Sequence, residues 1–133
     1  MIREDLGGFV SLSRFRIVPV IRYPLSIYPF NLVMSNYLKE AGKLAEQLVA
    51  NHYTKSNHTI LERNFTIRGG ELDIVVENAN ELIFIEVKAV HHTDDLHNYI
   101  TPTKLSALKR TIEYYLYKHP TKKSIRLDIA FVR

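Results

Sequence analysis

The apolar positions of the chain follow a helical rhythm from residue 37 to residue 53, where they recur at three- and four-residue steps. Ser35 precedes this segment and is a suitable N-cap residue. The rhythm then changes, and apolar runs separated by polar or glycine-containing turns occupy residues 59–65, 71–76 and 82–90. The pattern therefore predicts one helix followed by three strands, of which the last two form a β-hairpin.

A second helix and a last strand complete the predicted order. Thr101 and Pro102 form a cap followed by a proline at the first helical position, and apolar residues then line one face as far as Leu116. Residues 125–131 alternate between apolar and polar side chains, as a half-buried strand does. The predicted order is αβββαβ, which indicates an α/β fold.

The beginning of the chain, residues 1–33, does not share these rhythms. Its apolar stretch at residues 17–30 is interrupted by three prolines and an arginine, so it cannot form a membrane-spanning helix, and no signal-peptide cleavage site follows it. Met34 opens a segment that has the character of a natural protein start. We therefore expect residues 1–33 to be an N-terminal extension outside the core, residues 34–133 to be the folded domain, and no contact with a membrane.

Composition excludes several classes of function. A chain of 133 residues is long enough to bury a two-layer core without cross-links. It contains no cysteine, which excludes disulfides, thiolate zinc sites and thiol nucleophiles, and fits a reducing compartment such as the cytoplasm. The formal net charge of +4 favours an anionic partner such as nucleic acid.

Charged residues interrupt the two apolar strands of the predicted hairpin. On residues 82–90 the side chains of Phe84, Glu86 and Lys88 share one face, so Glu86 and Lys88 stand side by side. Asp73 lies in the partner strand, and the length of the intervening loop brings it back across the sheet towards this pair. Two carboxylates and one ammonium group are therefore expected to converge.

Such a convergence predicts a metal-dependent phosphodiester hydrolase. Carboxylates held close together repel each other unless a cation joins them, and Mg²⁺ prefers carboxylates, waters and phosphate oxygens as ligands. The ion would polarise the scissile phosphate and lower the pKa of a bound water, while Lys88 would orient that water or stabilise charge on phosphorus. Asp73, Glu86 and Lys88 are the candidate catalytic residues.

An aspartate followed at a distance by Glu-x-Lys resembles the motif of the PD-(D/E)XK, or restriction endonuclease-like, nuclease superfamily. Four blocks extend the resemblance: Gly42-x-x-x-Glu46, Ile60-Leu61-x-Arg63-Asn64, Gly70-Glu71-Leu72-Asp73-Ile74 and Phe84-Ile85-Glu86-Val87-Lys88. In this order they resemble the YraN-like family of small bacterial proteins, which are described as endonuclease-like and distantly similar to archaeal Holliday junction resolvases. The resemblance covers residues 36–131 and does not extend to residues 1–33.

The resemblance implies a restriction endonuclease-like fold, with a mixed β-sheet flanked by helices, for residues 34–133. It also implies hydrolysis of DNA phosphodiester bonds with Mg²⁺ or Mn²⁺, including DNA at branched or junction structures. Glu46 maps onto an additional acidic residue that completes the metal site, so the implied metal ligands are Glu46, Asp73 and Glu86. Related resolvases act on two strands, which makes a homodimer compatible with this interpretation.

Simpler interpretations exist for each candidate residue. The aspartate and the Glu-x-Lys pair also fit a cross-strand ion pair on a solvated face. Glu46 also fits a surface glutamate of a helix. Alternation would allow Glu71 to line the site beside Asp73, but we expect it at a strand edge on the surface. Asp128 is expected to pair with Arg126 or a surface lysine rather than to act in catalysis.

Candidate phosphate contacts are Arg63, Arg68 and Lys104, although scattered cations are usually only solvated. Two function classes therefore remain. The first is a divalent-metal endonuclease, and the second is a non-catalytic nucleic-acid-binding protein that keeps the nuclease fold. Both predict binding to DNA, but only the first predicts cleavage.

Overall fold

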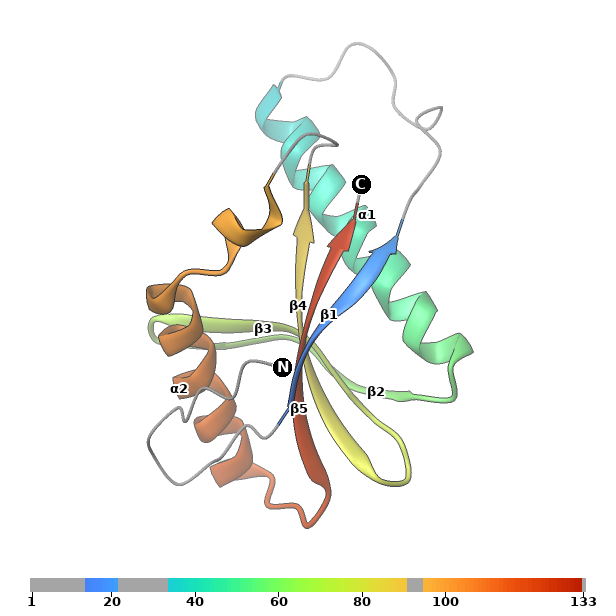
Figure 1. Cartoon of the computed structure of the whole chain (residues 1–133), viewed down its shortest axis with the longest axis vertical. Coiled ribbons are helices and arrows are strands. Elements are labelled where there is room, and N and C mark those ends of the chain that lie inside the picture. The colour runs from blue at the N-terminus through green and yellow to red at the C-terminus, as the bar shows by residue number, and fades with distance from the viewer. Residues whose placement is uncertain (1–13, 22–33, 91–94, 133) are drawn as a thin grey trace.

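The computed structural model describes residues 14–21, 34–90 and 95–132, and a mixed β-sheet forms its centre (Figure 1). The described strands are β1 (Arg14–Ile21), β2 (Thr59–Ile67), β3 (Gly70–Glu77), β4 (Glu81–Ala89) and β5 (Ser124–Val132). They lie in the order β1-β5-β4-β3-β2. Strands β2, β3 and β4 are antiparallel neighbours, whereas β5 pairs in parallel with both β4 and β1.

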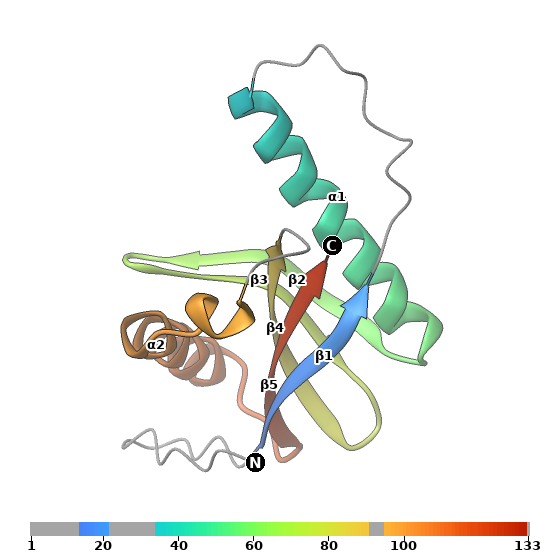
Figure 2. The same cartoon turned by 45° about the horizontal axis from the view of Figure 1, so that its top comes forward.

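Two helices cover opposite faces of this sheet, as Figure 2 shows. Helix α1 spans Met34–Lys55, and helix α2 spans Pro102–Lys118 after a short 3₁₀ helix, η2 (Leu96–Tyr99). Val49 and Tyr53 of α1 are buried in one apolar cluster, while Ile112 and Tyr115 of α2 are buried in the other. From Met34 onwards the predicted order αβββαβ and the mixed sheet flanked by helices are confirmed.

Strand β4 shows why these residues form a central strand. Ile83 and Ile85 point into the cluster under α1, and Leu82 and Phe84 point into the cluster under α2. All four are buried, so both faces of the strand are covered. A strand covered on both faces needs a nearly continuous apolar run, which is the pattern found in the sequence.

The predicted boundaries of four strands and of the second helix agree with the observed elements to within two residues. Helix α1 begins at Met34, so Ser35 lies within its first turn and the expectation of an N-cap at Ser35 was wrong. The predicted cap of the second helix is also confirmed, because the Thr101 hydroxyl accepts a hydrogen bond from the Lys104 N–H at 3.3 Å and Pro102 begins the helix. No helix in the described part of the chain is both long and apolar enough to span a membrane.

Strand β1 is the element that the sequence pattern did not predict. It lies at the edge of the sheet and pairs in parallel with β5, with an irregular register between Val18 and Ile21. Pro19 falls within this irregularity, and proline is tolerated in edge strands because its missing N–H weakens only one side of the ladder. Pro19, one of the three prolines that exclude a membrane-spanning helix here, is therefore compatible with a short edge strand.

The turn between β2 and β3 approaches helix α2 very closely. A Cβ atom on Gly70 would lie 2.1 Å from Oγ1 of Thr111 and 3.1 Å from the carbonyl oxygen of Ala107. Thr111 is fully buried, and its hydroxyl donates to that same carbonyl at 2.8 Å. Gly69 has a φ of 85°, which side chains rarely adopt. Glycine at both positions therefore allows the hairpin and the helix to pack.

We expect Gly70→Ala to lower the free energy of unfolding by about 1–3 kcal/mol or more, because the new methyl group collides with backbone and with a buried side chain. The matched control is Gly42→Ala in α1, where a Cβ meets nothing within 4 Å. That variant should gain about 0.5–1 kcal/mol, since alanine is the better helix former. Urea denaturation of both variants checks the pair, and equal stabilities would contradict the packing described for Gly70.

Removal of residues 1–33 is expected to leave a cooperatively folding domain. The described members of both apolar clusters all lie within residues 45–132, which the shortened chain keeps. Its loss uncovers the backbone edge of β5, and such edges promote association between chains. We expect the melting temperature of residues 34–133 to fall by no more than about 8 °C, which corresponds to roughly 1 kcal/mol for a domain of this size. A truncated chain without a cooperative melting transition would show that the extension belongs to the core.

Candidate active site at the fork between two strands

Strands β3 and β4 separate at one defined position. Their register runs from the pair Glu77 and Leu82 to the pair Ile74 and Ile85, which is the last one between these two described strands. Asp73 comes next on β3, and its Oδ2 accepts a hydrogen bond from the backbone N–H of Val87 at 2.7 Å. A carboxylate thus replaces a main-chain acceptor, and the two strands diverge beyond it as a fork.

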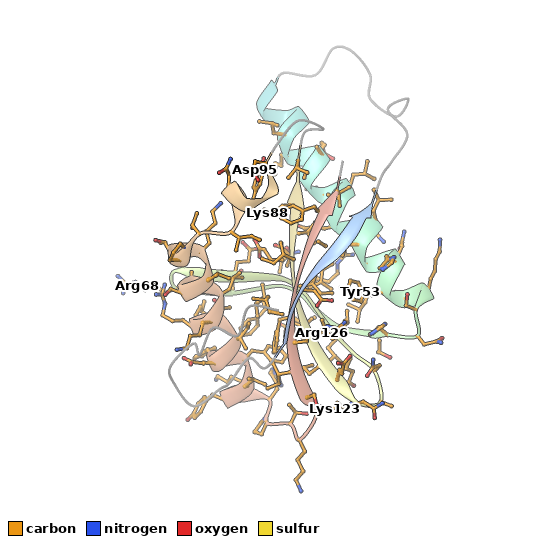
Figure 3. The ribbon with its side chains drawn as sticks, in the orientation of Figure 1. Tyr53, Arg68, Lys88, Asp95, Lys123 and Arg126 are labelled. Carbon is orange, nitrogen blue, oxygen red and sulfur yellow. The ribbon has the colours of Figure 1, made fainter. Side chains whose placement is uncertain are left out.

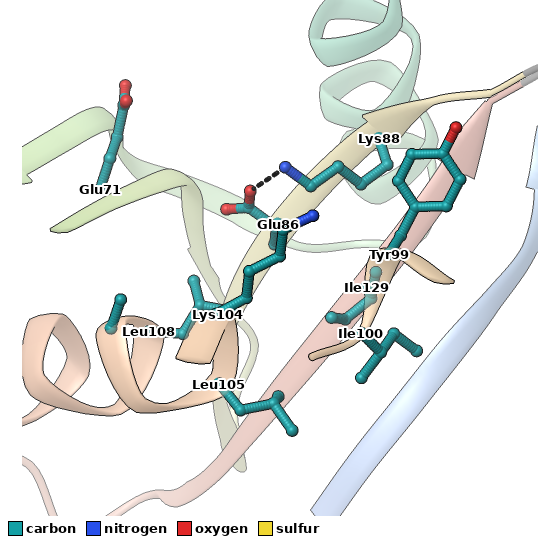
Figure 4. Close-up of a pocket in the computed structure, with 10 residues that line it drawn as sticks. Glu71, Glu86, Lys88, Tyr99, Ile100, Lys104, Leu105, Leu108 and Ile129 are labelled. Atoms are coloured by element: carbon teal, nitrogen blue, oxygen red, sulfur yellow. Dashed lines mark ion pairs between the residues drawn. The ribbon is translucent and has the colours of Figure 1, made fainter. Parts of the chain in front are cut away.

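Glu86 and Lys88 lie on the β4 arm of this fork. Their side chains occupy the same face, as the alternation predicted, and Lys88 Nζ lies 2.9 Å from Glu86 Oε1 (Figure 4). The Glu86 side chain is only 16% exposed and the Lys88 side chain only 30% exposed. The ion pair is therefore partly shielded from water, which strengthens it relative to a pair on an open surface.

The carboxyl group of Asp73 is strongly perturbed. Burial, followed by the negative charge of Glu86, raises its pKa from 3.8 to about 7. The hydrogen bond from Val87 and the positive charge of Lys88 oppose this rise without cancelling it. A pKa near 7 means that the carboxyl group changes its charge near neutral pH, which is a property typical of functional sites.

Glu46 approaches the same region from helix α1. Its pKa is raised by partial burial and by the charges of Asp73 and Glu71, whereas the charge of Arg63 lowers it. The Arg63 guanidinium also donates to Gln47 Oε1 at 3.0 Å, which ties strand β2 to α1 beside Glu46. The half-buried Glu46 is therefore electrostatically linked to Asp73, as the metal-site prediction requires.

A cavity of about 190 Å³ opens beside the fork on the α2 side (Figure 4). Charged groups on its wall come from Glu71, Glu86, Lys88 and Lys104. The remainder of the lining is apolar or aromatic and comprises Tyr99, Ile100, Leu105, Ala107, Leu108 and Ile129. Glu71 is exposed, as expected, but it also lines this cavity and raises the pKa of Asp73, which is the alternative position that alternation allowed for it.

The three predicted phosphate contacts are placed differently from one another. Lys104 lines the cavity, and Arg63 lies beside α1 near Glu46. Arg68 belongs to the turn between β2 and β3, and Figure 3 shows it at the outer edge of the molecule, well apart from Lys88. The structure therefore brings Lys104 and Arg63 near the fork and leaves Arg68 outside it.

Asp128 has a structural role on the face of the sheet that α1 covers, where it meets Tyr53. It is fully buried, accepts a hydrogen bond from the Tyr53 hydroxyl, and forms an ion pair with the Arg126 guanidinium, whose Nε lies 2.8 Å from its Oδ1. Arg126 also bridges to Glu81, with 2.9 Å between Nη1 and Oε2. The predicted pairing of Asp128 with Arg126 is confirmed, and the network ties α1, β4 and β5 together.

The donor set at the fork fits a hard divalent cation by its chemistry. Asp73, Glu86 and Glu46 offer carboxylate oxygens. The negative charge of Glu86 raises the pKa of Asp73, the negative charge of Asp73 raises the pKa of Glu46, and a cation would relieve both repulsions. The positions of these carboxylates do not form a complete metal-binding site. Among the residues that the structure describes, no three His, Cys, Asp or Glu side chains stand close enough together to hold an ion, and Glu86 is engaged by Lys88.

The fold and the fork define the class of protein: a small α/β domain with an acidic site on two adjacent strands, beside a cavity that lysine side chains help to line. Residues 45–132 match a family model described as uncharacterised protein family UPF0102. The UPF0102 proteins of Aliarcobacter butzleri and Dictyoglomus thermophilum are 36% and 38% identical to the chain over 95 and 97 residues. Each match covers 71% of this chain, and 86% and 82% of the respective relative. The chain therefore belongs to the UPF0102 family, the YraN-like family that its motifs resemble.

The perturbed Asp73 predicts a specific dependence of stability on pH. Its pKa is higher in the folded chain than in the unfolded chain, so the folded state binds more protons between about pH 4 and pH 7 and loses stability as the pH rises through this window. Asp73→Asn keeps an acceptor for the Val87 N–H but carries no charge. We expect it to flatten this decline and to raise the free energy of unfolding by roughly 1–3 kcal/mol at about pH 8.

Denaturant titrations across this pH range measure the effect. Glu40→Gln is the matched control, because Glu40 is an exposed carboxylate of α1 paired only loosely with Lys43 at 3.4 Å. It should leave the pH profile unchanged. A profile of Asp73→Asn that is parallel to that of the unchanged protein would mean that the Asp73 pKa is not raised.

Proposed function

We propose that this protein is a metal-dependent endonuclease that hydrolyses DNA phosphodiester bonds. The observation that carries the proposal is the buried carboxyl group of Asp73, with a pKa of about 7, anchored at a strand fork next to Glu86 and Lys88. Carboxylates and a lysine on adjacent strands, beside a cavity with a second lysine, form a set suited to phosphoryl chemistry.

The proposed cofactor is Mg²⁺ or Mn²⁺, held by Asp73, Glu86 and Glu46. When bound, the ion would polarise the scissile phosphate and lower the pKa of a bound water. The proton on Asp73 and the cation compete for the same carboxylate, so binding of the ion should weaken as the pH falls below about 7.

The protein side chains contribute orientation and charge. The hydrogen bond from Val87 fixes the direction of the Asp73 carboxylate, so that its geometry does not have to be organised when substrate arrives. Lys88 presents its ammonium group at the cavity wall, where it would hold a phosphate oxygen and stabilise negative charge that develops on phosphorus. Lys104 supplies a second cation on the same wall.

The proposal extends to the PD-(D/E)XK superfamily and to branched or junction DNA as substrate. Its support is the position of the motif: Asp73 on one strand, and Glu86 and Lys88 on the next, in a mixed sheet covered by a helix on each face. A homodimer acting on two strands and a cytoplasmic location belong to the same proposal.

A second candidate function is non-catalytic binding of nucleic acid. The closed ion pair between Glu86 and Lys88 favours it, together with the lack of a three-ligand cluster among the described residues. In that case Lys88 and Lys104 would contact phosphates while no bond is broken.

Incubation of the purified protein with branched and linear DNA in Mg²⁺ or Mn²⁺ separates the two functions. We expect cleavage by the unchanged protein and a loss of at least about a hundredfold in rate for Glu86→Ala and for Lys88→Ala. Glu40→Ala and Lys43→Ala remove the partners of an exposed ion pair on α1 and should cleave at the normal rate.

Each alternative outcome has a distinct meaning. Cleavage that persists in Glu86→Ala and Lys88→Ala would come from a contaminating nuclease and would defeat the enzymatic proposal. DNA binding without cleavage, with an affinity that falls steeply with salt, would establish the second candidate function instead.

A further inference from the structure

The cavity beside the fork has two chemically different sides. The side towards β3 and β4 carries the charged groups of Glu71, Glu86 and Lys88, whereas the side towards η2 and α2 carries apolar and aromatic groups together with Lys104 (Figure 4). The endonuclease proposal uses only the charged groups. A cavity that is mostly apolar with a few polar groups at one end is typical of a site for a specific small group rather than for bulk solvent.

Tyr99 is the aromatic residue on the apolar side, and its neighbours hold it in place. Its ring packs edge to face against the fully buried Phe131, with 6.0 Å between the ring centroids. Lys104 Nζ lies 5.7 Å from the centroid of the Tyr99 ring. An aromatic ring packed against Phe131, with an ammonium group over it, combines the two features that attract a flat group attached to an anion.

A nucleotide has this combination of a flat base and an anionic phosphate. Stacking of a base on an aromatic side chain is favourable for every type of base, while lysines at the rim attract the phosphate. The carboxylates of Glu71 and Glu86 would accept hydrogen bonds from exocyclic amino groups and would repel a phosphate from the interior. The charges therefore favour an arrangement with the base inside the cavity and the phosphate near Lys88 and Lys104.

The dimensions of the cavity decide between a paired and an unpaired base. A volume of about 190 Å³ accommodates a single flat group but not a stacked base pair or a duplex. The major groove of a duplex alone is about 12 Å wide. A base within a duplex would have to leave the stack to enter, and this costs least where the base is mismatched or already single-stranded.

We propose that the cavity formed by Tyr99, Ile100, Leu105 and Leu108 binds one unpaired base of the DNA, so that the scissile phosphate lies next to an unpaired nucleotide. This inference rests on the proposed function and specifies its substrate class. Tyr99 acts as the stacking platform, Lys104 holds the adjacent phosphate, and Glu86 and Lys88 face that phosphate from the fork.

The test uses the full chain and a DNA duplex that carries one extrahelical 2-aminopurine, whose fluorescence reports stacking. Calcium replaces magnesium so that binding is measured without cleavage. The unchanged protein should alter the fluorescence of the extrahelical base and bind this duplex about five- to tenfold more tightly than the fully paired duplex. Tyr99→Ala should abolish both the fluorescence change and the preference, and Tyr99→Trp should retain them.

The matched control is Tyr117→Ala, which removes a tyrosine of α2 that is 80% exposed and does not line the cavity. It should behave as the unchanged protein does. Equal affinity of the unchanged protein for the paired and the extrahelical duplex would overturn the inference, as would a preference that survives Tyr99→Ala. Circular dichroism shows whether the Tyr99→Ala variant is folded. If the variant is unfolded, the fluorescence change of the extrahelical base with the unchanged protein decides whether the cavity binds a base.

Failure of this inference differs from failure of the proposed function. If the cavity does not bind a base, cleavage that depends on Glu86 and Lys88 still occurs, but the 2-aminopurine signal stays constant. If the protein is not an endonuclease, the signal changes in calcium while no product forms in magnesium.

Discussion

The hydrogen bond from the Val87 N–H to the Asp73 carboxylate is the interaction on which the site depends. It occupies the position where β3 and β4 stop pairing, so it satisfies a main-chain donor that the fork would otherwise leave without its ladder partner. It also holds the partly buried carboxylate next to Glu86, where burial and the charge of Glu86 raise the pKa of Asp73, although the hydrogen bond itself lowers that pKa. The same contact thus marks the fork and fixes the place in which the pKa of Asp73 is raised.

The two-sided core explains how a small domain tolerates such a site. Helix α1 covers one face of the sheet and α2 covers the other, so β4 is buried on both sides up to the fork. The buried network of Tyr53, Arg126 and Asp128 adds polar links under α1. The unfavourable electrostatics are confined to one end of β3 and β4, where the strands separate, and the remaining contacts outweigh them. Such local strain is common at functional sites.

The sequence predicted the helices, four of the strands and the adjacency of Glu86 and Lys88 because each depends on local periodicity. It did not predict β1, since Pro19 removes one N–H and resembles a loop signal until a neighbouring strand is known. It also gave no sign that Tyr99 and Glu86 would line the same cavity, because the two residues lie in different elements that only the tertiary fold brings together. Glu71 was placed on the surface correctly, but its position on the cavity wall arises from the divergence of β3 from β4.

By itself the sequence determined the order of elements, the two faces of the central strand and the identity of the charged groups, because side-chain alternation and helical spacing are properties of neighbouring residues. Tertiary structure alone decided that β3 and β4 would fork at Asp73, that Glu46 would approach from another layer, and that an aromatic cavity would open beside Lys88. The reason is physical: burial, strand register and the pKa of a carboxyl group depend on groups that are distant in the chain and become neighbours only when the sheet and both helices have packed.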